Sequence, residues 1–259
     1  MSKNDVGMTY IGGPTALIEW SGLRFLTDPT FDPAGSAYPT NEYTLRKTAG
    51  PAIDASAIGP IDVVLLSHDH HFDNLDRAGR ALLAGARTVL TTEAGAMRVG
   101  RNARGMVAWQ QRGIRSPEGA VLQVTATPAR HGPAGGDRGP VIGFALTRAD
   151  APGTVYVSGD TVWYDGLREV SERFDVRLAL LFCGRARVSV AGENDLTMSA
   201  DDAVHAAQMM PRATIVPLHY EGWEHFTQSR ADLEGAFAKE GLSQRLAWPA
   251  AGVRTSIAV

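Results

Sequence analysis

Histidine and aspartate side chains cluster in one short segment of the chain, Ser67-His68-Asp69-His70-His71-Phe72-Asp73. Imidazole nitrogens and carboxylate oxygens are the donors that divalent metal ions prefer in proteins. Because side chains two residues apart project to the same side of an extended segment, His68 and His70 can grip one ion. The segment therefore predicts metal chemistry, with Asp73 either binding an ion or capping the helix expected to follow.

Four apolar runs of the sequence end in side chains of this kind. The run Val63 to Leu66 leads into the cluster, and the other three lead to His131, to Asp160 and to His219. Strand ends on a rigid sheet can hold several ligands with the accuracy that a metal site needs. If these strands lie side by side, we expect the four groups to meet at one place.

The elements that must position these residues are short apolar strands with helical segments between them. Strands are predicted at 16–20 and 23–27, which form a hairpin about Ser21-Gly22, and at 61–66, 88–91, 121–126, 141–146, 155–158, 178–182 and 214–218. Helices are predicted at 73–83, 199–210 and 229–239. Hairpins followed by mixed strands and helices favour an α/β fold of two sheets with helices outside, in a single domain spanning 1–259.

Composition narrows the class of protein. Hydrophobic residues make up 44% and charged residues 20%, which is typical of a chain with a packed core. The formal net charge is −3 and the sequence has no basic run, so neither a nucleic acid nor a membrane surface is an expected partner. No apolar run approaches the ~18 residues of a membrane span. A small-molecule substrate is therefore expected, while homo-oligomerisation stays open.

The cellular location is predicted from cysteine content and from the N-terminus. The single cysteine, Cys183, cannot form a disulfide within the chain, which fits a reducing compartment. The polar start Met1 to Asp5 lacks the apolar stretch of a signal peptide. We therefore expect a cytoplasmic protein.

As a set, the motifs resemble those of the metallo-β-lactamase superfamily. The segment Ser67 to Asp76, then His131, the Gly159-Asp160-Thr161 triplet and His219 follow in that family's order. Asp28-Pro29 after the early hairpin resembles the branch with ascorbate-6-phosphate lactonases and N-acyl-phosphatidylethanolamine phospholipase D. The resemblance implies a four-layer αββα sandwich with metals at one edge between the sheets. It implies a first ion on His68, His70 and His131, and a second on Asp73, His219 and a bridging Asp160.

Two positions depart from the family's pattern. The family spacing would place the motif aspartate at position 72, where this chain has Phe72. The chain should therefore bulge between His68 and Asp73, and either His70 or His71 is the second ligand. The family's last motif histidine is Asn74 here, and an amide oxygen is a weaker, harder donor than imidazole. This suggests a second site that is weakened or that prefers manganese or iron.

The chemistry expected from such a site is hydrolysis. Two divalent ions, zinc first and manganese or iron as alternatives, would make a metal-bound hydroxide available at neutral pH. It would attack a lactone, ester, amide or phosphodiester, while Asp73 orients it and shuttles its proton. An iron-dependent redox enzyme and a non-catalytic metal-binding module are the competing hypotheses.

Further residues are expected around the ligands. Asp28 is expected to accept the second N–H of a metal-bound histidine, and Asp69 to brace the loop. The residues expected to line the pocket mouth are Trp163, Tyr164, Arg185, Glu221 and His225.

Overall fold

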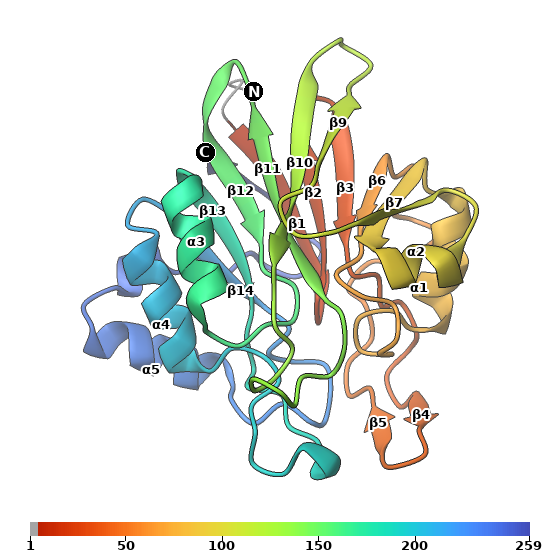
Figure 1. Ribbon diagram of the computed structural model, residues 1–259, viewed down its shortest axis with the longest axis vertical. Coiled ribbons are helices and arrows are strands. Elements are labelled where there is room, and N and C mark those ends of the chain that lie inside the picture. Colours follow the sequence, from red (N-terminus) through yellow and green to blue (C-terminus); the bar gives the residue numbers. More distant parts are fainter. Residues whose placement is uncertain (1–4) are drawn as a thin grey trace.

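Two β-sheets packed face to face, with helices on the outside, make up the computed structural model (Figure 1). It describes residues 5–259, so positions 1–4 of the polar N-terminus lie outside the described residues. The first sheet has the strand order β15 (Arg254–Ala258), β1 (Asp5–Gly12), β2 (Thr15–Trp20), β3 (Leu23–Thr27), β6 (Val63–Leu65), β7 (Thr88–Thr92) and β8 (Ala103–Met106). The second has the order β14 (Thr214–Leu218), β13 (Val176–Phe182), β12 (Ala151–Val157), β11 (Ile142–Arg148), β10 (Val121–Pro128) and β9 (Gln111–Arg115).

The helices form the two outer layers. Near the first sheet lie α1 (Arg77–Leu82) and α2 (Glu93–Val99), and near the second lie α3 (Asp165–Arg173), α4 (Ala200–Met209) and α5 (Arg230–Lys239) (Figure 1). A small hairpin of β4 (Ala37–Pro39) and β5 (Thr44–Arg46) extends from the loop after β3. Short 3-10 turns complete the helical segments at Leu83–Gly85, Ser189–Ala191 and Ser243–Arg245. This is the four-layer αββα sandwich predicted above.

The alternation of side chains along β13 shows how the layers are held together. Leu178, Leu180 and Phe182 face the first sheet and belong to the core between the sheets. The residues between them, Ala179 and Leu181, face the other way and pack with α4 and α5. Because successive strand residues point to opposite faces, a strand that is apolar at every position must be covered on both sides.

Several expected elements have different bounds in the structure. The helix predicted from Asp73 begins at Arg77, because Asp76 caps it by accepting a hydrogen bond from Gly79 N at 2.8 Å. Asp73 therefore lies in the turn before the helix, not at its start. The predicted strand 61–66 is shortened to β6. The elements that were not predicted are strands β1, β4, β5, β8, β9 and β15 and helices α2 and α3.

None of the helices in the described part of the chain is both long enough and apolar enough to cross a membrane.

Candidate metal centre

The four motif segments meet at one edge of the sandwich. Strands β10, β12 and β14 run in the same direction, because β11 is antiparallel to both of its neighbours and β13 is parallel to both of its own. Their ends therefore bring His131, Asp160 and His219 to the same edge. The first sheet joins them there, since Ile142 N donates to Ser67 O at 3.2 Å. The connecting loops gather at the lower end of the molecule in Figure 1.

Three imidazole nitrogens converge in the first part of the site. His71 Nδ1 lies 3.0 Å from His68 Nε2 and 3.1 Å from His131 Nε2. His131 Nδ1 lies 2.8 Å from the Leu196 carbonyl oxygen, which can only accept, so Nδ1 carries the proton and Nε2 keeps its lone pair. His68 Nδ1 is likewise engaged outside the site, 2.9 Å from Ser67 Oγ.

Two carboxylates and a fourth imidazole form the second part. His219 Nε2 lies 3.4 Å from Asp73 Oδ2 and 3.4 Å from Asp160 Oδ1. The other oxygen of Asp160, Oδ2, lies 3.6 Å from His131 Nε2. Asp160 therefore stands between the two groups, one oxygen toward each. The groups His68–His131–Asp160 and Asp73–Asp160–His219 each bring their donor atoms within 4.8 Å of one another.

The residues present fit a pair of bound cations. Asp160 Oδ2 and both ring nitrogens of His219 are buried without a hydrogen-bond partner among the described residues. Leaving such groups unsatisfied is costly, and bound cations would engage Asp160 Oδ2 and one ring nitrogen of His219. The donor set of imidazoles and carboxylates is also the one that zinc, iron and manganese accept.

The electrostatics of the two parts differ. Burial lowers the pKa of His71 to about 3 and holds the pKa of His68 well below its usual range. Both rings are therefore neutral, and each has a nitrogen lone pair that can bind a cation. Burial opposes charge on His219 too, but Asp160 and Asp73 outweigh it and raise the pKa of His219 to about 10. The two carboxylates of the second part therefore stabilise a positive charge on His219.

The predicted site residues are brought together, with His70 at the margin. His68, Asp73, His131, Asp160 and His219 are buried and His71 is half-buried. His70 is exposed, and its Nε2 points out of the site and lies 2.8 Å from the Arg138 carbonyl oxygen. It still belongs to a third group, in which it lies with His68 and His71.

The braces around the ligands differ in part from the expectation. Asp69 braces the loop as predicted, because Arg98 donates to its two oxygens at 2.9 and 2.6 Å. Among the described residues, Asp28 makes no hydrogen bond with a histidine, so that expectation was wrong. Its carboxyl group accepts from Ser67 N at 2.6 Å and from Asn74 Nδ2 at 3.4 Å, while burial raises the pKa of Asp28 to about 8. It holds the backbone just before His68 and leaves the ring of His68 to Ser67.

The pocket at the site is lined by residues that differ from those expected at its mouth. Arg185 pairs with Asp195 at 2.9 Å, Glu221 accepts from the Tyr10 hydroxyl at 2.9 Å, and Trp163 and Tyr164 stack on other side chains. Of the expected set, only His225 lines the pocket, together with Tyr43, Leu45, Arg138, Val188 and Leu196. The lining residues come mainly from long loops, whose conformation a sequence pattern does not encode.

His225 lines the pocket as expected, and the structure also places it directly against a predicted ligand. Its Nε2 lies 3.0 Å from Asp73 Oδ2, and its side chain is 10% exposed. The only signal for it in the sequence is indirect: Asn74 takes the place of an expected histidine, which leaves room for another imidazole.

Comparison with known proteins places the fold and site in a family. A family model described as "Beta-lactamase superfamily domain" matches residues 23–220, and the chain therefore belongs to that superfamily. The chain is 27% identical to a UPF0173 metal-dependent hydrolase of Pyrobaculum neutrophilum, over 87% of this chain and 88% of that protein.

Two solved structures show the same fold. An isothiocyanate hydrolase from Delia radicum gut bacteria aligns with a TM-score of 0.82 and 23% identity, covering 98% of this chain and all of that one. CmlA, a diiron β-hydroxylase from Streptomyces venezuelae, aligns with a TM-score of 0.66 and 13% identity, covering 100% of this chain and 55% of that one.

These findings make the chain a metal-dependent hydrolase of the β-lactamase superfamily. The narrower resemblance to the lactonase and phospholipase D branch stays a prediction.

Proposed function

We propose that the chain hydrolyses a lactone, ester, amide or phosphodiester of a small molecule at a centre of two divalent metal ions, with zinc as the first candidate. The observation that carries this proposal is the convergence of His71, His131, Asp160 and His219 from two sheets. Asp160 and His219 also have buried polar atoms without a hydrogen-bond partner among the described residues. Structural need alone does not explain such a cluster, because an apolar core would be cheaper to bury.

For the first ion, we propose His68, His71 and His131 as ligands. The choice of His71 over His70 rests on distance, since His71 Nδ1 lies within 3.1 Å of both other nitrogens. The Nε2 of His70 faces the Arg138 carbonyl instead. The extra residue in the motif thus moves the second ligand along by one position. Asp73 and His219 would hold the second ion, and Asp160 would bridge both.

Bound cations would supply hydroxide at neutral pH by lowering the pKa of water to about 7. The protein's part is to orient that nucleophile and to move its proton. Asp73 Oδ2 lies 3.4 Å from His219 Nε2, beside the position of the second ion. This carboxylate is therefore placed to accept the proton and pass it to the leaving group. The neutral rings of His68 and His71 keep their lone pairs available as donors at the same pH.

The small size of the pocket favours a substrate that presents only a small group to the site. Its volume is about 10 Å³, which is close to the space for one water molecule. Apolar side chains of Leu45, Val188 and Leu196 narrow it, while Arg138 and Tyr43 offer polar atoms. A substrate would therefore present one small reactive group to the ions and leave its remainder outside.

The test is metal analysis together with a hydrolysis screen of lactones, esters, amides and phosphodiesters. We expect hydrolysis of at least one class, its loss with a chelator, and its return with zinc, manganese or iron. A metal-loaded protein without hydrolytic activity on any class would contradict the substrate proposal.

A redox enzyme using iron is the second candidate. The observation in its favour is the likeness to the diiron protein CmlA, whose low identity shows the shared fold alone. Purification with two iron ions, an oxygen-linked absorption band and no hydrolysis would support it. A non-catalytic module is set aside, because donors from all four motif segments converge in the described structure. A cytoplasmic location and the lack of a nucleic-acid partner stay predictions.

A further inference from the structure

The replacement of a motif histidine by Asn74 leaves the second group one imidazole short. Asn74 offers no imidazole in its place: its amide nitrogen donates to Asp160 Oδ1 at 3.2 Å and to Asp28 Oδ2 at 3.4 Å. Its Oδ1 is buried without a hydrogen-bond partner among the described residues, and an amide oxygen is a weaker donor to a cation than imidazole. Its side chain is fully buried between these two carboxylates and acts as a hydrogen-bond donor to them. A donor N–H cannot ligate a cation.

A different imidazole stands on the other side of Asp73. His225 Nε2 lies 3.0 Å from Asp73 Oδ2, the same oxygen that lies 3.4 Å from His219 Nε2. The Nδ1 atom of His225 is buried and has no hydrogen-bond partner among the described residues. Among the described residues, the Asp73 carboxylate is therefore the hydrogen-bond partner of this ring, which also packs against Phe226.

The loop that carries His225 is fixed on both sides of it. Arg187 N donates to the His225 carbonyl oxygen at 3.0 Å, and Glu224 N donates to the Arg46 carbonyl oxygen at 3.0 Å. Trp223 forms a β-bridge with Lys47, and Phe226 forms one with Ala186. A ligand on such an anchored loop is as well positioned as one on a strand end.

We propose that His225 is a ligand of the second metal ion and supplies the imidazole that Asn74 removes. The second site would then hold Asp73, Asp160, His219 and His225, two carboxylates and two imidazoles. This inference rests on the proposed function, because it needs the two-metal centre. It also replaces the expectation of a weakened second site, since the number of imidazoles is restored.

The test compares metal binding by the full-length protein with that of His225→Ala, His225→Gln and His205→Ala. His205 is the matched control, an exposed histidine on α4 outside the centre. Each metal-free protein is titrated with zinc against a chromophoric chelator, and bound metal is counted after dialysis. Folding of each variant is checked by the circular dichroism and melting of the metal-free form.

Wild type and His205→Ala are expected to bind about two ions, as two-metal centres do. His225→Ala is expected to retain the first ion and to bind the second at least about tenfold more weakly, the scale on which single site residues affect metal affinity. His225→Gln distinguishes metal ligation from a hydrogen bond to Asp73. The glutamine N–H can still donate to Asp73, but the side chain lacks the imidazole nitrogen that would bind the ion.

Unchanged affinity for the second ion in His225→Gln would overturn the proposal, whatever the alanine variant does. Loss of both ions together in His225→Gln would also overturn it, since the role would then be structural. If wild type itself binds no metal, the two-metal centre fails; if wild type binds two and the variants bind two equally well, this assignment alone fails.

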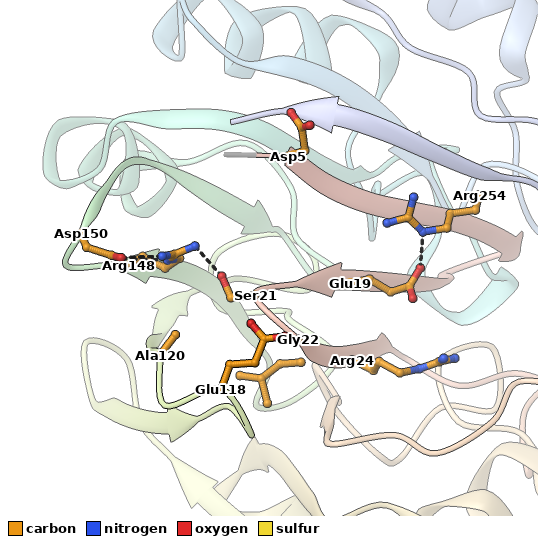
Figure 2. Close-up of a pocket in the computed structure, with 11 residues that line it drawn as sticks. Asp5, Glu19, Ser21, Gly22, Arg24, Glu118, Ala120, Arg148, Asp150 and Arg254 are labelled. Atoms are coloured by element: carbon orange, nitrogen blue, oxygen red, sulfur yellow. Dashed lines mark hydrogen bonds and ion pairs between the residues drawn. The ribbon is translucent and has the colours of Figure 1, made fainter. Parts of the chain in front are cut away.

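A second cavity lies away from the metal centre. Its volume is about 760 Å³, and Glu19, Ser21, Arg148, Asp150 and Arg254 are among its lining residues (Figure 2). Arg148 donates to Asp150 and Ser21 at 2.6 Å each, and Arg254 donates to Glu19 at 2.7 Å. Arg148 and Asp150 thus satisfy each other, as do Arg254 and Glu19.

Discussion

His219 has a backbone φ of 55°, in the left-handed region that residues other than glycine rarely adopt. Such conformations cost about 1–3 kcal/mol and persist where the surroundings enforce them. Here His219 N donates to the Gly13 carbonyl oxygen at 2.8 Å, while its ring packs against Phe182 and Phe226. The strain turns the imidazole from the end of β14 toward Asp73 and Asp160, which is its role in the site.

Asp73→Asn tests the residue to which we assign proton transfer. The amide keeps the size of the side chain but cannot accept the proton, so turnover of the substrate found in the screen should fall about 10²–10⁴-fold. Thermal melting of the metal-free protein checks the fold, and Asp201→Asn on the exposed start of α4 is the control. Activity within a few-fold of wild type would remove Asp73 from the mechanism.

At the scale of elements, two ion pairs hold the loops that carry the ligands, one with a half-exposed arginine and one fully buried. Asp69 pairs with Arg98 at 2.6 Å and so ties the histidine loop to α2. Lys47 pairs with Asp76 at 2.8 Å, and the same carboxylate caps α1. Since Trp223 also contacts Lys47, this pair links the loop after β5 to the loop of His225.

Asp69→Ala should weaken metal binding without touching a ligand. Removing the brace frees the backbone between His68 and His71, and changes of this kind lower metal affinity about 10–100-fold. Competition with a chelator measures the loss at the first site. Arg98→Ala should have a similar effect because it removes the same contact, whereas unchanged affinity in both variants would mean that the loop needs no brace.

Lys47→Ala should destabilise the fold strongly. It leaves the buried Asp76 carboxylate without its cation, and breaking a buried pair in this way costs about 3–5 kcal/mol. Urea unfolding gives the free energy, with Arg168→Ala in an exposed pair on α3 as the control, where little change is expected. Equal stabilities for the two variants would contradict the role given to this pair.

The elements also show how far the sequence alone could go. Strands such as β6, β13 and β14 are predictable because an apolar run buried on both faces makes up all or most of each strand. Strand β15 was missed because only Ile257 in it is buried, and the polar edge strand β9 has no buried residue at all. Edge strands lack the periodic signal on which sequence analysis depends.

The ligand set was predictable to a similar degree. Donor types at strand ends pointed to His68, His131, Asp160 and His219, which the structure brings together. The choice between His70 and His71, and the closeness of His225 to Asp73, depend on how a bulged loop and a distant loop fold. No spacing rule covers either case, because both are set by tertiary contacts.

For the whole molecule, metal removal should lower stability. The unpartnered donors at the centre are satisfied when cations bind the folded state, and binding stabilises it by RT ln(1 + [L]/Kd). At a free metal concentration of about 100 Kd this amounts to about 2.7 kcal/mol. Melting temperatures with chelator and after adding zinc, manganese or iron measure it. An identical melting temperature in both states would contradict metal binding by the native fold.

The centre draws its donors from both layers of the sandwich, and this has a consequence for how the chain tolerates change. His71 and Asp73 follow a strand of one sheet, while His131 and His219 follow strands of the other. The core between the sheets contains Phe25 and Phe144. If a mutation there shifted one sheet against the other, the two sets of donors would move apart. The volumes of core side chains far from the site therefore also matter for activity, because they hold the two sets of donors at their distances.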